Sequence, residues 1–313
     1  MMIKRMKYNK RSFRNDVIFI VALLGVVLFI FGYEIKLLDS EYTIKRITSR
    51  EIDYDNYRNY YLKDDILIEA KEKAEHVKKE HPILKEDAFV NEIGYLTFSM
   101  MMSSYHRKDV SLSDEYIFYR GIHRAASDPK FLKLYQFNQA ILSDLVYFPV
   151  PKIENQSADI HYTDSWSQPR TYGGDRKHEG TDLMASNNKR GFFPVVSITD
   201  GIVEKMGWLD QGGYRIGIRS VSKGYFYYAH LDSYAPELKE GDKVIAGQLL
   251  GFMGDSGYGK EGTKGKFDVH LHMGIYVNAG DKEMSVNPYY ILKMIEKNRT
   301  SWQNGVTNGD LFR

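Results

Sequence analysis

An unbroken apolar stretch near the N-terminus limits most strongly how this chain can fold. Residues 17–33 read VIFIVALLGVVLFIFGY and contain no charged side chain. A bilayer span needs roughly 20 apolar residues, with about 17 as the lower limit, and Ile35, Leu37 and Leu38 can extend the apolar surface. A helix in the core of a soluble domain would have a polar face, which this stretch lacks. The sequence therefore predicts a transmembrane anchor over residues 17–38.

The charges around this stretch predict its orientation. Residues 1–16 hold six basic groups and one acidic group, whereas the rest of the chain holds 37 basic and 40 acidic groups. Because basic flanks stay in the cytoplasm, we expect a cytoplasmic head and an extracytoplasmic body. A cleaved signal peptide also fits the basic start, but no small-residue cleavage pattern follows the stretch. The slightly acidic body argues against nucleic-acid binding, which requires a basic face.

The region after the anchor is predicted to be helical. Apolar residues recur there at spacings of three and four, which is the period of one helix face. A further helix is expected near residues 114–125, and the Tyr-rich residues 39–65 are interpreted as a stalk. The three periodic sets are Ile66, Ala70, Ala74 and Val77; Phe89, Ile93, Leu96 and Met100; and Leu134, Phe137, Ile141 and Leu145.

The C-terminal half changes to short strands between glycine-rich turns. The clearest strand covers residues 269–277, where apolar side chains alternate with His270, His272, Gly274 and Tyr276. Alternation with period two indicates a half-buried strand. The other expected strands are 194–206, 214–221, 225–231 and 244–253, and 288–297 is an expected closing helix.

The predicted fold class is α+β, with a transmembrane helix, a helical juxtamembrane region and an all-β antiparallel C-terminal domain. A Pro- and Gly-rich segment separates the last two regions and is interpreted as a linker or groove loop, in which Trp166 and Tyr172 are candidate groove residues. The predicted boundaries are 1–16 for the basic head, 17–38 for the anchor, 39–147 for the helical region, 148–177 for the linker, 178–297 for the β domain and 298–313 for a polar tail.

Four of the nine histidines fall in three short motifs of the β half. The motifs are His178-Glu-Gly-Thr-Asp182, Tyr227-Tyr-Ala-His230 and His270-Leu-His272. Residues two apart on a strand project from one face, so we expect His270 and His272 side by side. The chain has no Cys, so a metal site must use His, Asp or Glu. Zinc bound by three such ligands keeps its fourth coordination position open for water. It lowers the pKa of that water, so that hydroxide forms at neutral pH.

Taken singly, each motif has a simpler explanation. One His is more often a surface or structural residue, an H-x-H pair arises by chance, and Asp182 could occupy a turn. The other five histidines lack such a context, and we expect them to be structural or surface residues: His76, His81, His106, His123 and His161.

In order and spacing, the three motifs resemble those of the lysostaphin/LytM-type zinc metallopeptidases, the peptidoglycan endopeptidases of bacteria. The resemblance covers residues 172–288 and includes HEGTD, YYAHLD, EGDKVIAGQLLGFMGDSG and HLH. It implies a barrel-sandwich (duplicated hybrid motif) peptidase domain and one Zn²⁺ held by His178, Asp182 and His272. It also implies catalytic roles for His230 and His270. Residues 258–266 are longer and more charged than the usual turn of this family, which puts substrate specificity in question.

The segment GGDRKHEGTD together with the anchor is similar, more narrowly, to the sporulation-linked LytH type, which cleaves L-Ala–D-Glu bonds in spore-cortex stem peptides. The resemblance thus implies peptidoglycan stem or bridge peptides as partners and a single-pass protein of the bacterial cell membrane. Two other classes stay open. One is a non-catalytic, enzyme-like scaffold that binds the wall or a partner protein. The other is a lipoyl-type carrier suggested by residues 238–253, although neither Lys239 nor Lys243 has the setting of a modified lysine.

Overall fold

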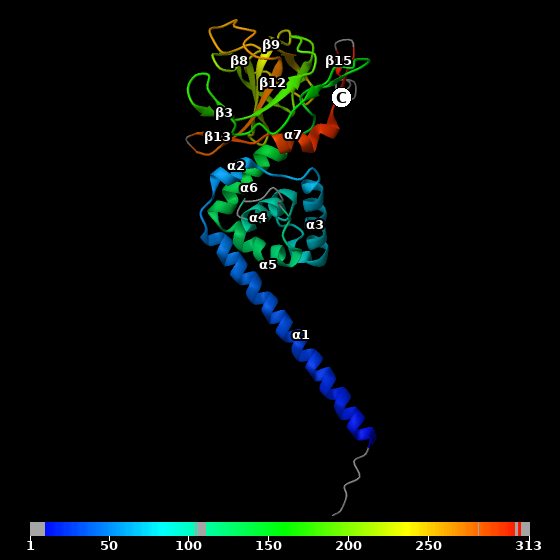
Figure 1. The fold of residues 1–313 in the computed structure, drawn as a ribbon. Coiled ribbons are helices and arrows are strands. Elements are labelled where there is room, and N and C mark those ends of the chain that lie inside the picture. Colours follow the sequence, from blue (N-terminus) through cyan, green and yellow to red (C-terminus); the bar gives the residue numbers. More distant parts are fainter. Residues whose placement is uncertain (1–9, 104, 106–110, 281, 304–305, 308–313) are drawn as a thin grey trace, which may run out of the picture.

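The computed structural model describes residues 10–103, 105, 111–280, 282–303 and 306–307. It has three parts: a long N-terminal helix, a layer of shorter helices and a β domain (Figure 1). Helix α1 (Lys10–Ser49) projects from the helical layer on the side away from the β domain (Figure 1). The mixture of helices with an antiparallel sheet confirms the predicted α+β class.

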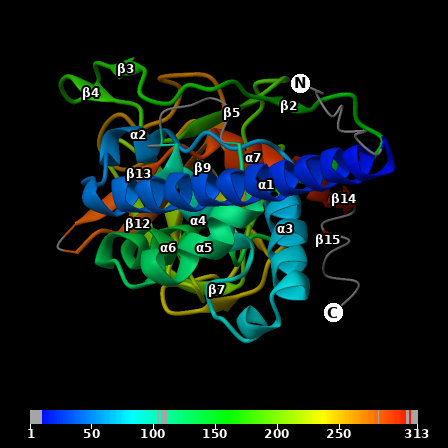
Figure 2. The ribbon, with the colours of Figure 1, turned by 90° about the horizontal axis from the view of Figure 1, so that it is seen from below.

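Helix α1 contains the apolar stretch seen in the sequence. Val17–Leu38 is long and apolar enough to cross a membrane, and the rest of the chain buries none of it. A signal sequence near the N-terminus can meet the same criterion of length and apolar composition. The end of α1 packs on the helical layer, where Ile44 is buried against helix α5 (Glu115–Ala126). Seen from below, α1 overlaps α4 (Glu92–Met102) and α5, two helices of the layer that it contacts (Figure 2).

The helical layer forms where the sequence predicts helices. The apolar stripe of α3 is buried at all four predicted positions, and α5 begins because Asp114 accepts hydrogen bonds from the Tyr116 and Ile117 amides. Asn91 caps α4 in the same way, so Phe89 lies before that helix, and Leu145 lies after α6. The helices are α2 (Tyr54–Asn59), α3 (Ile66–Glu80), η1 (Pro82–Leu84), α4 (Glu92–Met102), α5 and α6 (Pro129–Leu142).

The prediction of a stalk over residues 39–65 is wrong for its second half. Tyr57 and Tyr60 are 1% exposed, and their hydroxyls donate to Asn138 Oδ1 over 2.9 and 2.8 Å. Asn138 Nδ2 donates in turn to Thr97 Oγ1 over 2.9 Å. Tyrosines that look exposed in a polar segment are buried here because a distant asparagine satisfies both hydroxyls.

The β domain is organised by one antiparallel sheet with the strand order β10-β7-β8-β9-β12-β5-β2. Strand β11 (Leu249–Met253) pairs with both β6 (Pro194–Val196) and β9, while β13 (Glu283–Val286) pairs with β12. The other members are β10 (Lys243–Val244), β7 (Gly201–Leu209), β8 (Gly213–Ser220), β9 (Tyr225–Tyr234), β12 (His270–Asn278), β5 (Thr181–Ala185) and β2 (Ile160–His161).

The structure differs from the expected strands at several points. The predicted strands 194–206 and 244–253 are each divided in two, as β6 and β7 and as β10 and β11. Residues 148–177 contain strands of their own: β1 (Lys152–Ile153), β2, β3 (Pro169–Arg170) and β4 (Arg176–Lys177). The tail adds β14 (Ser301–Gln303) and β15 (Val306–Thr307), and β14 pairs with β1. Helix α7 (Tyr289–Ile295) lies in the predicted closing helix and is followed by η2 (Glu296–Asn298).

The helical layer and the β domain share one core. A continuous cluster of buried apolar side chains runs through both regions, and α6 packs along β12. Arg58 of α2 donates through Nε to Ser285 O over 2.9 Å, and Asp144 accepts from the backbone amide and hydroxyl of Ser222. These contacts fix β13 and the turn between β8 and β9 to the helical layer. Because β13 and β9 both pair with β12, they help to position the strand that carries His270 and His272.

Candidate metal centre

Three neighbouring strands bring the histidine motifs together. Strand β12 lies between β5 and β9, and its His272 pairs with Asp182 on one side and Ala229 on the other. His178 precedes β5, and His230 follows Ala229. A cavity of about 1020 Å³ is lined by all five predicted site residues, together with aromatic and charged side chains.

His178, Asp182 and His272 present three ligand atoms in a small triangle. His178 Nε2 lies 3.0 Å from both Asp182 Oδ1 and His272 Nδ1, and His272 Nδ1 lies 2.9 Å from Asp182 Oδ1. In a tetrahedral site with metal–ligand distances of about 2.0–2.1 Å, neighbouring ligand atoms are about 3.3 Å apart. The triangle therefore fits around one small divalent cation.

The protons around this triangle also suit a metal. His178 Nδ1 lies 3.0 Å from Ser165 O, and a carbonyl only accepts, so Nδ1 carries the proton. In the neutral ring, Nε2 then directs a lone pair at the carboxylate of Asp182, a contact that needs a cation or a proton between the two atoms. Burial alone would raise the pKa of Asp182, but the neighbouring rings of His178 and His272 outweigh it and hold that pKa well below its usual range.

Arg170 holds the second oxygen of the candidate ligand Asp182. Its Nη2 donates to Asp182 Oδ2 over 2.7 Å, which leaves Oδ1 directed at the two imidazoles. Arg170 belongs to β3, inside the segment expected to be a linker or groove loop. Sequence reasoning missed this residue because no local pattern links position 170 to position 182.

His230 and His270 lie beside the triangle with one nitrogen each directed into the cavity. Their Nδ1 atoms lie 2.8 Å from Ser256 O and 2.7 Å from Asp268 O, so both Nδ1 atoms are donors. The Nε2 atoms of the neutral rings are then free to accept protons, and His270 Nε2 lies 3.7 Å from Asp182 Oδ1. Burial, followed by the nearby His270 and His272, lowers the pKa of His230 well below its usual value, which favours the neutral form.

A distortion of β9 directs His230 into the cavity. Its φ angle is +63°, in the left-handed region that most side chains avoid. The register between β8 and β9 shifts at the same place, between Tyr214 and Ile216. Such bulges turn a side chain away from its regular strand position and are frequent beside functional sites.

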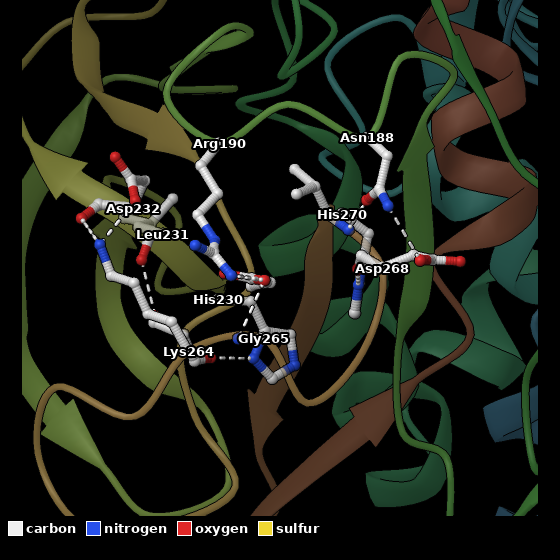
Figure 3. A network of polar contacts seen from close by, with 12 residues as sticks. Asn188, Arg190, His230, Leu231, Asp232, Lys264, Gly265, Asp268 and His270 are labelled. Atoms are coloured by element: carbon white, nitrogen blue, oxygen red, sulfur yellow. Dashed lines mark hydrogen bonds and ion pairs between the residues drawn. The ribbon is translucent and has the colours of Figure 1, made fainter.

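Both acceptor carbonyls belong to the segment that connects β11 with β12, and charged contacts fix this segment (Figure 3). Arg190 binds Asp255 through two hydrogen bonds of 2.6 and 2.8 Å, and Lys264 lies 2.6 Å from Asp232 Oδ1. Asn188 donates to the carboxylate of Asp268 over 3.1 Å. Of the charged residues that distinguish 258–266 in the sequence, Lys264 therefore helps to hold the segment that supports the two histidines.

Aromatic side chains border the cavity, and the candidate groove residue Tyr172 packs on one of them without lining the cavity itself. Its ring stacks on Tyr258, with centroids 4.1 Å apart, and Tyr258 lines the cavity. Phe267 packs against the rings of His230 and His270 at 4.6 and 5.0 Å. Trp166 instead lies below the guanidinium of Arg58, 5.5 Å from its ring centroid.

The remaining histidines that the structure describes lie elsewhere. His76 pairs with Glu115, His81 stacks on Tyr119, and His123 pairs with Asp87. His161 is exposed in β2, and His106 falls outside the described residues. Their surface and structural roles agree with the expectation from the sequence.

Several known proteins are similar to this chain. The model of "Peptidase family M23" matches residues 176–288. The L-Ala--D-Glu endopeptidase of Bacillus subtilis strain 168 is 38% identical over 202 residues, which are 64% of this chain and 60% of that protein. Lysostaphin of Staphylococcus simulans is 33% identical over 118 residues, which are 37% of this chain and 21% of that protein. The chain thus spans less than two thirds of the length of these curated relatives.

A solved structure resembles a larger part of the chain. It is the crystal structure of a Ruminococcus gnavus protein provisionally described as a glycyl-glycine endopeptidase, LytM. It has a TM-score of 0.65 and 38% sequence identity, and the match covers 83% of this chain and 98% of that one. Residues 148–313 are only about half of the chain, so the likeness extends into the helical region that precedes them. The predicted LytM-type relationship is therefore confirmed, and the chain belongs to peptidase family M23.

Proposed function

We propose that this protein is a membrane-anchored zinc endopeptidase that hydrolyses the L-Ala–D-Glu bond in peptidoglycan stem peptides. The triangle of His178, Asp182 and His272 atoms beside two further imidazoles is the observation that carries the proposal. The bond is proposed from the Bacillus subtilis relative, which is named for it and is 38% identical.

Zinc suits the donor set better than calcium or magnesium. The three ligand atoms are two imidazole nitrogens and one carboxylate oxygen, a combination found in catalytic zinc sites. Calcium and magnesium prefer oxygen ligands in larger numbers. When bound, zinc supplies a Lewis acid that polarises a carbonyl and lowers the pKa of water.

His270 is the proposed general base. Its Nδ1–H donates to Asp268 O, so Nε2 can accept a proton from the attacking water beside the candidate ligands. The same proton then passes to the nitrogen of the leaving amine, and the peptide C–N bond breaks.

His230 is the proposed second catalytic residue. In its neutral form Nε2 accepts a hydrogen bond, which orients the attacking water. Once protonated, the ring can donate to the oxyanion or to the leaving amine. A neutral ring has only one N–H, and in His230 it is the Nδ1–H that binds Ser256 O. Nε2 can therefore only accept before the ring is protonated and can donate only afterwards.

The location is proposed from α1. With Val17–Leu38 in the bilayer and the basic head in the cytoplasm, the helical layer lies between the membrane and the β domain (Figure 1). Fusing a reporter that is active only outside the cytoplasm to the C-terminus tests this topology. The pairing of β11 with both β6 and β9 supports the proposed barrel-sandwich arrangement.

The function is tested with the full chain in a mild detergent. Metal analysis of the purified protein should find one zinc per chain. After the protein is incubated with vegetative or spore-cortex walls, mass spectrometry should detect new peptides that begin with D-Glu. Asp182→Asn should abolish both results. A wild-type protein that binds walls, holds no metal and releases no peptide would instead support the enzyme-like scaffold.

A further inference from the structure

A cation without a counter-ion lies in the same cavity as the metal centre. Arg215 of β8 lines this cavity, and its Nη1 atom is buried with no hydrogen-bond partner in the part of the chain that the structure describes. Burying a guanidinium nitrogen without a partner is costly, even where the rest of the side chain is half-buried, as in Arg215. Such a group in a native protein calls for an explanation, and a bound anion supplies one.

Another arginine of the same strand shows how a structural guanidinium is satisfied. Arg219 lies four residues further along β8, on the same face. It binds Glu204 through hydrogen bonds of 2.6 and 2.8 Å and Glu283 through one of 2.5 Å. Within the described residues, the Nη1 atom of Arg215 has no acidic partner of this kind.

The other charges of the cavity do not neutralise Arg215. Glu179 pairs with Arg58 at 2.5 Å, Asp182 faces the imidazoles and Arg170, and the Asp268 carboxylate accepts from Asn188.

The nearest aromatic groups leave Arg215 uncompensated as well. Burial raises the pKa of the Tyr227 hydroxyl far above its usual value, so that group stays neutral. Arg176 also lines the cavity and donates to neutral oxygens of Tyr172 and Tyr258. An anionic ligand therefore suits this part of the cavity.

The strand register places Arg215 near the reacting bond. Arg215 lies opposite the bulge of β9 at residues 229–230, Ala229 pairs with His272, and His272 pairs with Asp182. Two strand spacings of about 4.8 Å put the Arg215 backbone roughly 10 Å from that of His272, the length of about three extended residues. Arg215 and His272 line the same cavity, so the Arg215 guanidinium can contact substrate groups next to the scissile amide.

We propose that Arg215 is a specificity-determining residue that binds the free carboxylate of the D-Glu residue next to the scissile bond. This inference rests on the proposed function and names the substrate feature that is read. D-Glu has two carboxyl groups and continues the peptide through one, so the other is free unless amidated. A glycine–glycine bond has no carboxylate at this place. The planar guanidinium binds a carboxylate through two parallel hydrogen bonds, and a substrate that lacks it leaves the cation unpaired.

The test uses two synthetic stem peptides that differ in one group, with the zinc-loaded full chain in detergent. One peptide carries D-Glu with its free carboxylate, and the other carries the carboxamide. We expect kcat/KM to be roughly 10- to 100-fold higher for the carboxylate, as for a hydrogen-bonded charged group. In Arg215→Gln this preference should disappear, mainly through KM, and Arg215→Lys should retain part of it. Arg219→Gln is the matched control and should keep the full preference.

A second readout measures binding without turnover. Calorimetry with His270→Ala should show tighter binding of the carboxylate peptide, and the double variant with Arg215→Gln should bind both peptides equally. Thermal unfolding checks that Arg215→Gln folds. Wild-type protein that cleaves and binds both peptides equally would overturn the role of Arg215 and leave the proposed function intact. If the protein cleaved a pentaglycine peptide but neither stem peptide, the proposed L-Ala–D-Glu specificity would be wrong. If it cleaved none of these peptides, the proposed endopeptidase function would be wrong.

Discussion

The helical layer and the β domain both bury polar groups, but they treat them in opposite ways. Around Asn138, the hydroxyls of Tyr57 and Tyr60 and the Thr97 side chain use each other as donors and acceptors. Around Asp182, acceptor atoms converge within about 3 Å without enough protons to join them. The first arrangement is complete by itself, whereas the second becomes complete only with an ion from outside.

This difference separates structural networks from binding sites in the same chain. A satisfied buried network contributes to stability and specifies one packing. An unsatisfied one lowers stability and persists where a ligand compensates for it. Changes in the helical layer should therefore alter unfolding, while changes in the metal centre should alter metal content and turnover.

Removal of the candidate metal ligand should have the largest effect. In Asp182→Asn we expect no measurable zinc and no measurable turnover, because a neutral amide replaces the charged ligand. The thermal stability of the chelated protein should fall below that of chelated wild type, because the variant loses the charged partner of Arg170 and of the two imidazoles. Metal analysis, peptide hydrolysis and calorimetric melting measure these three quantities. Retention of one zinc and normal turnover would contradict the assignment.

Loss of the proposed base should separate catalysis from metal binding. We expect His270→Ala to lower kcat by roughly 10²- to 10⁴-fold, the usual contribution of a general base, while zinc content stays at one per chain. His161→Ala is the control, since that residue is exposed in β2, and it should leave kcat unchanged. A His270→Ala protein that loses zinc would show that the residue is a ligand instead.

A change in the hydrogen-bond network around Asn138 should lower stability and leave catalysis unchanged. Asn138→Ala leaves the Tyr57 and Tyr60 hydroxyls unpaired, so the free energy of unfolding should fall by about 2–4 kcal/mol. Denaturant unfolding measures this loss, and turnover at 25 °C should stay near the wild-type value. Tyr60→Phe removes one donor but leaves Asn138 a partner, so its loss should be smaller, about 1 kcal/mol. Equal losses in both variants would show that the hydrogen bonds do not matter.

Arg170 should tune the metal centre without belonging to it. We expect Arg170→Gln to weaken zinc affinity by roughly 10- to 100-fold, as is usual for groups that hold a metal ligand. Competition with a fluorescent chelator measures the affinity, and Arg170→Lys should lie between the variant and the wild type. Unchanged affinity in Arg170→Gln would mean that Asp182 is oriented by the imidazoles alone.

The smallest expected effect concerns pH. Because burial lowers the pKa of His230, the folded chain resists a proton that the unfolded chain accepts below about pH 6.5. The stability of the chelated protein should thus be full above that pH and should decrease as the pH falls, by at most about 1.4 kcal/mol per pH unit from this residue. Unfolding curves between pH 5 and 8 measure the slope, which His230→Gln should reduce. An unchanged slope in that variant would assign the effect to other groups.

Local patterns predicted the elements better than their limits. The stripe from Ile66 to Val77 became α3, because one helix face packs against a core whatever that core contains. The run from Pro194 to Met206 was expected as one strand but forms β6 and β7, since Val196, Ser197 and Ile198 are buried whether or not they are in strands. Burial sets the apolar pattern, while pairing sets where a strand ends.

Side-chain identity and spacing along the chain established the apolar span, the three histidine motifs and the absence of thiolate chemistry. Those properties depend on residues close in sequence, whose relation is governed by backbone geometry. The triangle of His178, Asp182 and His272 depends on pairing between β5 and β12, which are about 90 residues apart. Contacts across the fold also decide the hydrogen bond from Arg170, the Ser256 carbonyl beside His230, and the Nη1 atom of Arg215 that lacks a partner among the described residues. Only the tertiary structure decided these, because a distance between remote segments follows from strand register and packing.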